Sequence, residues 1–173
     1  SKSCMSPNDH TWAHELGHFF SLPHTFRGWE GIDYDASVPT STYRSQNRRG
    51  IESLDGSDCN SSGDRFCDTP PDYLSYRWPC DNQGFSIVQQ TDLNGETFRS
   101  DGTLFMSYAS DNCSNRFSDM QVNAMLANIN SVRRELLNNE TYAGKINDIP
   151  QAITPEDQAN LAFDNGILHW SKV

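Results

Sequence analysis

Residues 14 to 24 read HELGHFFSLPH and contain three of the chain's five histidines together with one glutamate. His14 and His18 are four residues apart, a spacing that puts two imidazoles on one face of a helix. The carboxylate of Glu15, one residue further round, then stands beside the point at which they aim. The helix stops after His18, so the following turn can bring His24 to the same point. Three protein nitrogens leave one tetrahedral position for water, which is typical of a catalytic zinc site.

The alternative is an ordinary helix that happens to carry histidines. A lone H-E-x-x-H arises by chance in many unrelated helices. A further histidine fixed six residues later makes an accident rare, at roughly one in several thousand chains of this size. His10 has no evident role, and we expect it to lie on the surface or to contact one of the metal ligands. His169 is expected to be structural. We therefore predict a zinc site at His14, His18 and His24.

The helix that carries these residues has signals at both ends. Ser6 suits the N-cap, Pro7 the first helical position, and Asp9 completes a pattern like a capping box. Ser21 and Pro23 end the helix, because proline cannot continue it. Apolar residues recur at helical spacing between these ends and predict an apolar face: Trp12, Leu16, Phe19 and Phe20.

A second helix is predicted at 118–137, SDMQVNAMLANINSVRRELL. Ser118 and Gln121 form a capping box at its start. An apolar stripe follows and is expected to pack in the core: Val122, Met125, Leu126, Ile129, Val132 and Leu136.

The residues from 28 to 102 are rich in Gly, Asp, Asn, Ser and Pro, with one candidate strand, FSIVQQ, at 85–90. Loops this long are uncommon unless they are functional or held by metals and disulfides. After about residue 147, two prolines and a DNG turn signal predict a linker followed by β-structure. We expect a domain at 1–147, and at 148–173 a linker with the start of a β-sandwich.

The chain has five cysteines, four of them in polar surroundings that predict loops: Cys4, Cys59, Cys67, Cys80 and Cys113. This favours disulfides in an oxidising compartment, with one thiol left over or paired outside the chain. A cysteine zinc site would need close pairs such as C-x-x-C, which the chain lacks. A secreted or cell-surface location follows.

Composition excludes two classes of partner. The 23 acidic residues outnumber the 13 basic ones, which gives a net charge of -10 and argues against a nucleic-acid surface. No apolar run approaches the roughly 18 residues that a membrane-spanning helix needs.

HELGHFFSLPH resembles the H-E-x-x-H-x-x-G-x-x-H signature of metzincin metallopeptidases. Those enzymes also carry a methionine in a turn beneath the metal, and LFMSYAS supplies Met106. CDTPPDY at 67–73 and MSYASDNCSNRFSDMQ at 106–121 resemble the pappalysin family in particular, and the resemblance spans residues 8 to about 130. Ser21 stands where the signature usually has glycine, so a left-handed backbone there would strain it.

The resemblance implies an α+β fold: the C-terminal subdomain of a metzincin, with the active-site helix, loops held by disulfides and calcium, and a C-terminal helix. It implies a zinc endopeptidase that cleaves peptides or proteins, in which Glu15 is the general base and then the general acid. Tyr108 would stabilise the oxyanion, unless it is only a packed turn residue. Met106 would form an apolar floor, and Cys80 would pair with Cys113.

Calcium is the second expected metal. Several oxygen ligands lie among glycines and suit its need for six to eight oxygens, and the pappalysin resemblance places calcium near the Asp-Thr-Pro segment. The alternative is a solvated acidic loop. The candidate ligands are Asp55, Asp58, Asp64, Asp68 and Thr69.

Metzincins generally lay substrate along a β-sheet that precedes the zinc helix, and few residues precede it here. We expect that sheet to be a missing N-terminal part and the isolated chain to cleave poorly.

Two alternatives remain. One is a non-catalytic binding or structural module that retains the zinc site, against which the intact Glu15 counts. The other is a zinc peptidase class with a downstream glutamate ligand, which His24 and Met106 disfavour.

Overall fold

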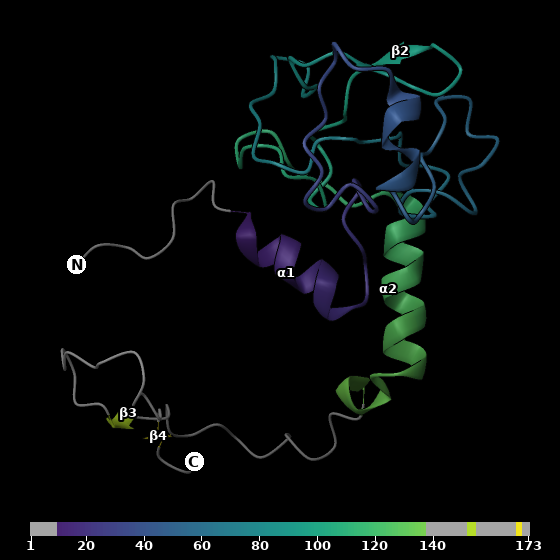
Figure 1. The fold of residues 1–173 in the computed structure, drawn as a ribbon. Helices are drawn as coiled ribbons and strands as arrows, with labels where there is room; N and C mark the ends of the chain where they lie inside the picture. The colour runs from purple at the N-terminus through teal and green to yellow at the C-terminus, as the bar shows by residue number, and fades with distance from the viewer. Residues whose placement is uncertain (1–9, 138–151, 155–168, 171–173) are drawn as a thin grey trace. The chain divides into compact units, whose positions relative to one another are not determined.

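The computed structural model describes residues 10–137, 152–154 and 169–170 (Figure 1). The chain divides into two compact units, Ser1–Arg133 and Arg134–Val173. The first contains helix α1 (Thr11–Phe19), the 3-10 helix η1 (Thr40–Ser45), strands β1 (Gln90–Thr91) and β2 (Thr97–Phe98), and helix α2 (Asp119–Ser131). The second contains the 3-10 helix η2 (Arg134–Leu137) and strands β3 (Ala152–Thr154) and β4 (His169–Trp170). The fold is a small α+β fold.

Among the described residues, each unit has one antiparallel pair of short strands. Gln90 pairs with Phe98 in β1 and β2, and Ala152 pairs with Trp170 in β3 and β4. The second pair lies where β-structure was expected after residue 147. The DNG turn and the boundary at 147/148 fall outside the described residues, so the β-sandwich stays a prediction.

The candidate strand at 85–90 is mostly not a strand. Its first two residues make isolated bridges, Phe85 with Asp101 and Ser86 with Cys80, and only Gln90 belongs to a named strand. The hydroxyl of Ser86 donates to the carbonyl of Val88 at 2.7 Å. Such local side-chain bonds compete with a regular ladder.

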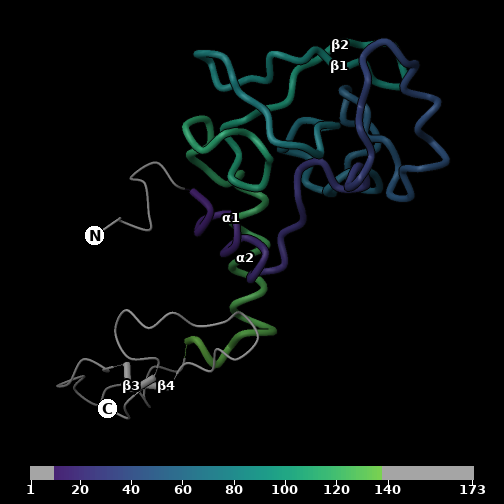
Figure 2. Tube along the Cα trace, turned by 60° about the vertical axis from the view of Figure 1, so that its left-hand side comes forward, coloured from purple at the N-terminus to yellow at the C-terminus, as the bar shows by residue number. Residues whose placement is uncertain are grey.

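Between α1 and α2 the chain runs mostly as loops (Figure 2). These loops surround a largely aromatic core. Trp29 stacks on Tyr73 with ring centroids 4.5 Å apart, and Phe98 meets Tyr73 edge to face at 5.0 Å. Two disulfides hold these loops, Cys59–Cys67 and Cys80–Cys113. The second is the pair that the resemblance implied, and Cys4 lies outside the described residues.

Helix α1 ends in a Schellman motif. The amide of Ser21 donates to the carbonyl of His18 at 2.8 Å, and the amide of Leu22 donates to that of Gly17 at 2.9 Å. This motif needs a left-handed residue, and Ser21 has φ of 70°. The serine that replaces the glycine of the metzincin signature is therefore strained at this position. The prediction that this helix begins at Ser6 and Pro7 is wrong, because α1 begins at Thr11 with His10 as its N-cap residue.

Helix α2 begins as predicted. Ser118 is the N-cap, and the reciprocal bonds of a capping box join it to Gln121. Asp68 adds a carboxylate at this positive helix end, accepting from the Ser118 hydroxyl and the Met120 amide at 2.8 Å each.

The apolar faces of both helices are exposed within the described residues, which corrects the prediction of a core stripe on α2. Trp12 is 67% exposed on α1, and Leu126 is 51% exposed on α2. The side of α1 that packs on the rest of the unit is instead the side of Gly17, its one buried residue. Periodicity predicted that each helix has an apolar face, but it did not say what covers that face.

Candidate metal centre

Three imidazole nitrogens converge at one point. The Nε2 atom of His18 lies 3.1 Å from that of His14 and 3.0 Å from that of His24. Among the described residues, this triad is the one group of three or more His, Cys, Asp or Glu close enough to share a metal ion. A tetrahedral zinc ion would put ligand nitrogens about 3.3 Å apart. The arrangement that the sequence predicted for the three histidines is therefore present, and it fits a metal.

Backbone carbonyls fix the tautomers of two of these rings. Nδ1 of His14 donates to the carbonyl of Phe105 at 2.7 Å, and Nδ1 of His18 donates to the carbonyl of Leu22 at 2.9 Å. A carbonyl only accepts, so Nδ1 carries the proton and the neutral ring turns a lone pair outward on Nε2. Two lone pairs 3.1 Å apart repel each other unless a proton or a metal ion lies between them.

The third ring is held by packing. His24 stacks on Phe26 with centroids 4.4 Å apart, and its Nδ1 lies 3.8 Å from a carboxylate oxygen of Glu30. Burial, and then the neighbouring histidines, lower the pKa of His24 to about 4. Burial also lowers the pKa of His14. Both rings are neutral at neutral pH, which is the form that binds metal.

Met106 packs against helix α1, and its position beneath a metal, which the resemblance implied, stays a prediction. It is fully buried, and a Cβ atom on Gly17 would come within 2.3 Å of its sulfur. Its carbonyl accepts the amide of Thr25 at 3.1 Å. The glycine of HELGH thus lets the turn approach the helix between His14 and His18, and the turn also contacts the residue that follows His24.

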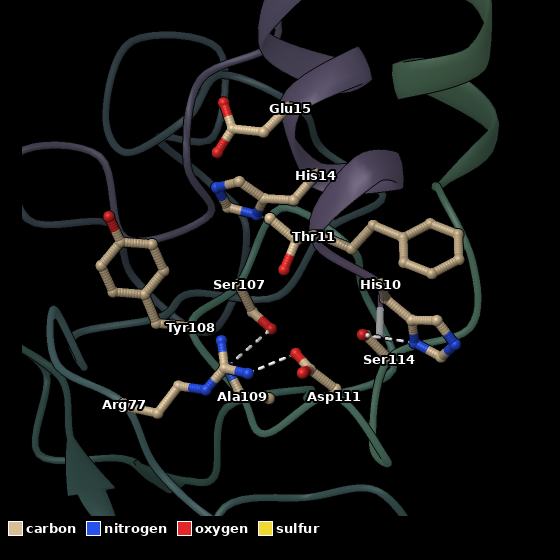
Figure 3. Close-up of a pocket in the computed structure, with 11 residues that line it drawn as sticks. His10, Thr11, His14, Glu15, Arg77, Ser107, Tyr108, Ala109, Asp111 and Ser114 are labelled. Carbon is tan, nitrogen blue, oxygen red and sulfur yellow. Dashed lines mark hydrogen bonds and ion pairs between the residues drawn. The ribbon is translucent and has the colours of Figure 1, made fainter. Parts of the chain in front are cut away.

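Glu15 and Tyr108 border a cavity of about 150 Å³ beside His14. Figure 3 shows the Glu15 carboxylate next to the His14 ring, with the Tyr108 ring across the cavity. The Tyr108 ring lies 4.9 Å from that of His24 and 4.5 Å from that of Phe26. Its hydroxyl makes no hydrogen bond within the described part of the chain, so it is available to a ligand. The packed-turn alternative accounts for the ring and leaves the hydroxyl without a partner.

Sequence reasoning missed Arg77, Asp111 and Ser114 at this cavity, and it expected His10 at the surface or in contact with a ligand. Arg77 pairs with Asp111 at its lower edge, and His10 bonds the Ser114 hydroxyl at 3.1 Å (Figure 3). His10 is therefore a neighbour of the site and not a member of the triad. No local pattern marks these residues, because they meet across sequence separations of 34 and 104 residues.

The five calcium candidates do not form one cluster. Asp68 caps α2, and Asp55, which is exposed, accepts from the amide and hydroxyl of Ser57. Asp58 accepts from the Ser53 amide at 2.9 Å, and Asp64 accepts from the Thr69 hydroxyl at 3.0 Å. Calcium at the full set is thus not supported by their placement, and calcium in this segment stays a prediction.

A buried glutamate that the sequence analysis missed lies among these acids. Glu52 is 4% exposed, and burial, followed by the charges of Asp64 and Asp58, raises its pKa to about 9. Burial also raises the pKa of Asp64 to about 7. Buried carboxylates in this arrangement need either protons or a cation.

The raised pKa of Glu52 should make the stability difference between the wild type and Glu52→Gln depend on pH. Without divalent cations, we expect the wild type to lose stability relative to Glu52→Gln as pH rises from 4.5 to 9. The unfolded chain releases the proton near 4.5, whereas the folded one keeps it until about 9. Denaturant unfolding of both proteins at pH 5, 7 and 9 with a chelator measures the difference. A difference that does not change with pH contradicts the prediction, and added calcium should reduce it if the ion binds here.

The two disulfides fit an oxidising, extracellular setting. Within the part of the chain that the structure describes, no helix has the length and apolar character needed to cross a bilayer. Comparison with models of protein families finds no match, and comparison with curated proteins finds no significant match.

Proposed function

We propose that this chain is the zinc-binding part of a secreted metalloendopeptidase of the pappalysin type. The observation that carries the proposal is the convergence of three Nε2 atoms, two of which are kept free of a proton by carbonyls bonded to Nδ1. Glu15 beside His14 supports catalysis over a purely structural metal, because a structural site has no use for a general base. The buried Met106 beneath Gly17 supports the metzincin type.

Each side chain then has a role. His14, His18 and His24 would hold the zinc ion, which when bound would lower the pKa of a coordinated water and polarise the scissile carbonyl. The Glu15 carboxylate accepts a proton from the attacking water and passes it to the leaving amine. The free hydroxyl of Tyr108 donates to the oxygen of the substrate carbonyl as negative charge develops there. The carbonyls of Phe105 and Leu22 keep two rings oriented throughout.

Metal analysis tests the proposal. We expect the purified protein to contain one zinc ion per chain, measured by mass spectrometry of the metals. A chelator should remove the ion and abolish the slow hydrolysis of a peptide library that we expect of this chain, and added zinc should restore both. A protein that neither retains nor rebinds a divalent metal contradicts the proposal. Zinc binding without hydrolysis of any peptide or protein would leave the alternative of a non-catalytic module.

A further inference from the structure

His24 is held differently from the other two histidines of the triad. His14 and His18 project from one helix, and their Nδ1 atoms bond to backbone carbonyls. His24 comes from the loop after the helix, and its Nδ1 lies 3.8 Å from Glu30, a residue exposed to solvent. The direction of its ring therefore depends on its stacking against Phe26 and on the backbone that carries it.

The residue that follows His24 is anchored in the protein interior. Thr25 is 3% exposed, and its hydroxyl donates to a carboxylate oxygen of Asp72 at 2.8 Å. Its amide donates to the carbonyl of Met106 at 3.1 Å. One residue thus joins the third histidine to the methionine turn and to a buried acid 47 residues further along the chain.

Asp72 is itself rigidly held. It is 4% exposed, and its second carboxylate oxygen accepts the Ser100 hydroxyl at 2.6 Å and the Leu74 amide at 3.0 Å. Gln90 extends the network, donating to Ser100 at 2.7 Å and accepting the Tyr73 amide at 2.8 Å. Apart from Thr25, these partners lie between residues 73 and 100, in the loops that join α1 to α2 and are called the loop body below. The carboxylate is therefore a fixed point to which Thr25 is bonded.

We propose that Asp72 is a positioning residue of the metal centre, which acts through the Thr25 hydroxyl to aim the imidazole of His24. The inference rests on the proposed function, since it takes the triad to bind zinc. It adds that the loop body, and not only the helix, sets the geometry of the third ligand. Partners that orient a metal ligand are typically worth 10- to 100-fold in metal affinity.

Substitutions at Thr25 test this role. Thr25→Val keeps the volume and removes the hydroxyl, whereas Thr25→Ser keeps the hydroxyl. Thr40→Val is the matched control, because Thr40 is also buried and its hydroxyl donates to the Thr91 carbonyl, away from the triad. The readouts are zinc affinity by competition with a chromophoric chelator, and the visible absorption spectrum of the cobalt-substituted protein.

We expect Thr25→Val to weaken zinc binding 10- to 100-fold and to change the cobalt spectrum. Thr25→Ser should restore both to nearly wild-type values, and Thr40→Val should lose stability with an unchanged spectrum. A wild-type affinity and spectrum in Thr25→Val, or an equal loss in Thr40→Val, overturns the inference. If Thr25→Val does not fold, Asp72→Asn decides by the same readouts. A wild type that binds no zinc overturns the proposed function, which is visible before any variant is made.

Discussion

The Glu15→Gln variant is expected to keep its zinc and to lose peptide hydrolysis by roughly 10²- to 10⁴-fold. The amide has nearly the shape of the carboxylate but cannot accept the proton that the attacking water must lose. Glu15 is exposed on α1 and is not a member of the triad, so metal content should stay at the wild-type value. Initial rates on a peptide cleaved by the wild type, measured together with zinc per chain, check both parts.

Glu96→Gln is the control, because it makes the same change at an exposed glutamate in the turn between β1 and β2. It should leave rate and zinc content unaltered. Hydrolysis by Glu15→Gln at the wild-type rate would remove Glu15 from the mechanism. Loss of zinc in that variant would instead make Glu15 part of the metal site.

The second large effect is expected at the centre of the triad. His18→Ala should reduce zinc affinity by more than about 100-fold, the upper end of what loss of an orienting partner costs. Its Nε2 atom lies 3.1 Å from that of His14 and 3.0 Å from that of His24, so it is the central ligand of the three. Without it, only two histidine ligands would remain for the zinc ion. Chelator competition at pH 7 measures the affinity.

His10→Ala provides a matched comparison, because His10 is the N-cap residue of the same helix and bonds Ser114 outside the triad. We expect its zinc affinity to equal that of the wild type. Equal affinities in His18→Ala and wild type would mean that zinc binds elsewhere. An equal loss in both variants would mean that the helix, rather than the ligand, had been disturbed.

Local features of this chain could be predicted from the sequence. The i, i+4 spacing of His14 and His18 fixes their common face, and the capping box of Ser118 and Gln121 depends on residues within one turn. Distant partners could not be predicted. The carbonyl of Phe105 that orients His14 is 91 residues away and belongs to the backbone, so no residue type signals it.

The loops between the helices illustrate a second limit. Asp68 has the residue type and the setting of a calcium ligand, yet its carboxylate caps α2 from a distance of 50 residues. Glu52 was overlooked because acidic composition does not reveal burial. Aperiodic sequence indicates loops, but the aromatic packing of Trp29 on Tyr73 that organises them arises only in three dimensions.

The Cys80–Cys113 bridge has a practical consequence for preparing this protein. It joins two cysteines 33 positions apart and closes a segment that contains Phe105, Met106 and Tyr108. In the chain-entropy view such a cross-link stabilises the native state by about 3–4 kcal/mol. Recombinant material made in a bacterial cytosol, where thiols stay reduced, would lack this cross-link. The segment that carries Met106 and borders the histidine cluster would then be less stable. Periplasmic expression, or oxidative refolding without reducing agents in the buffers, is the sounder source for metal titrations.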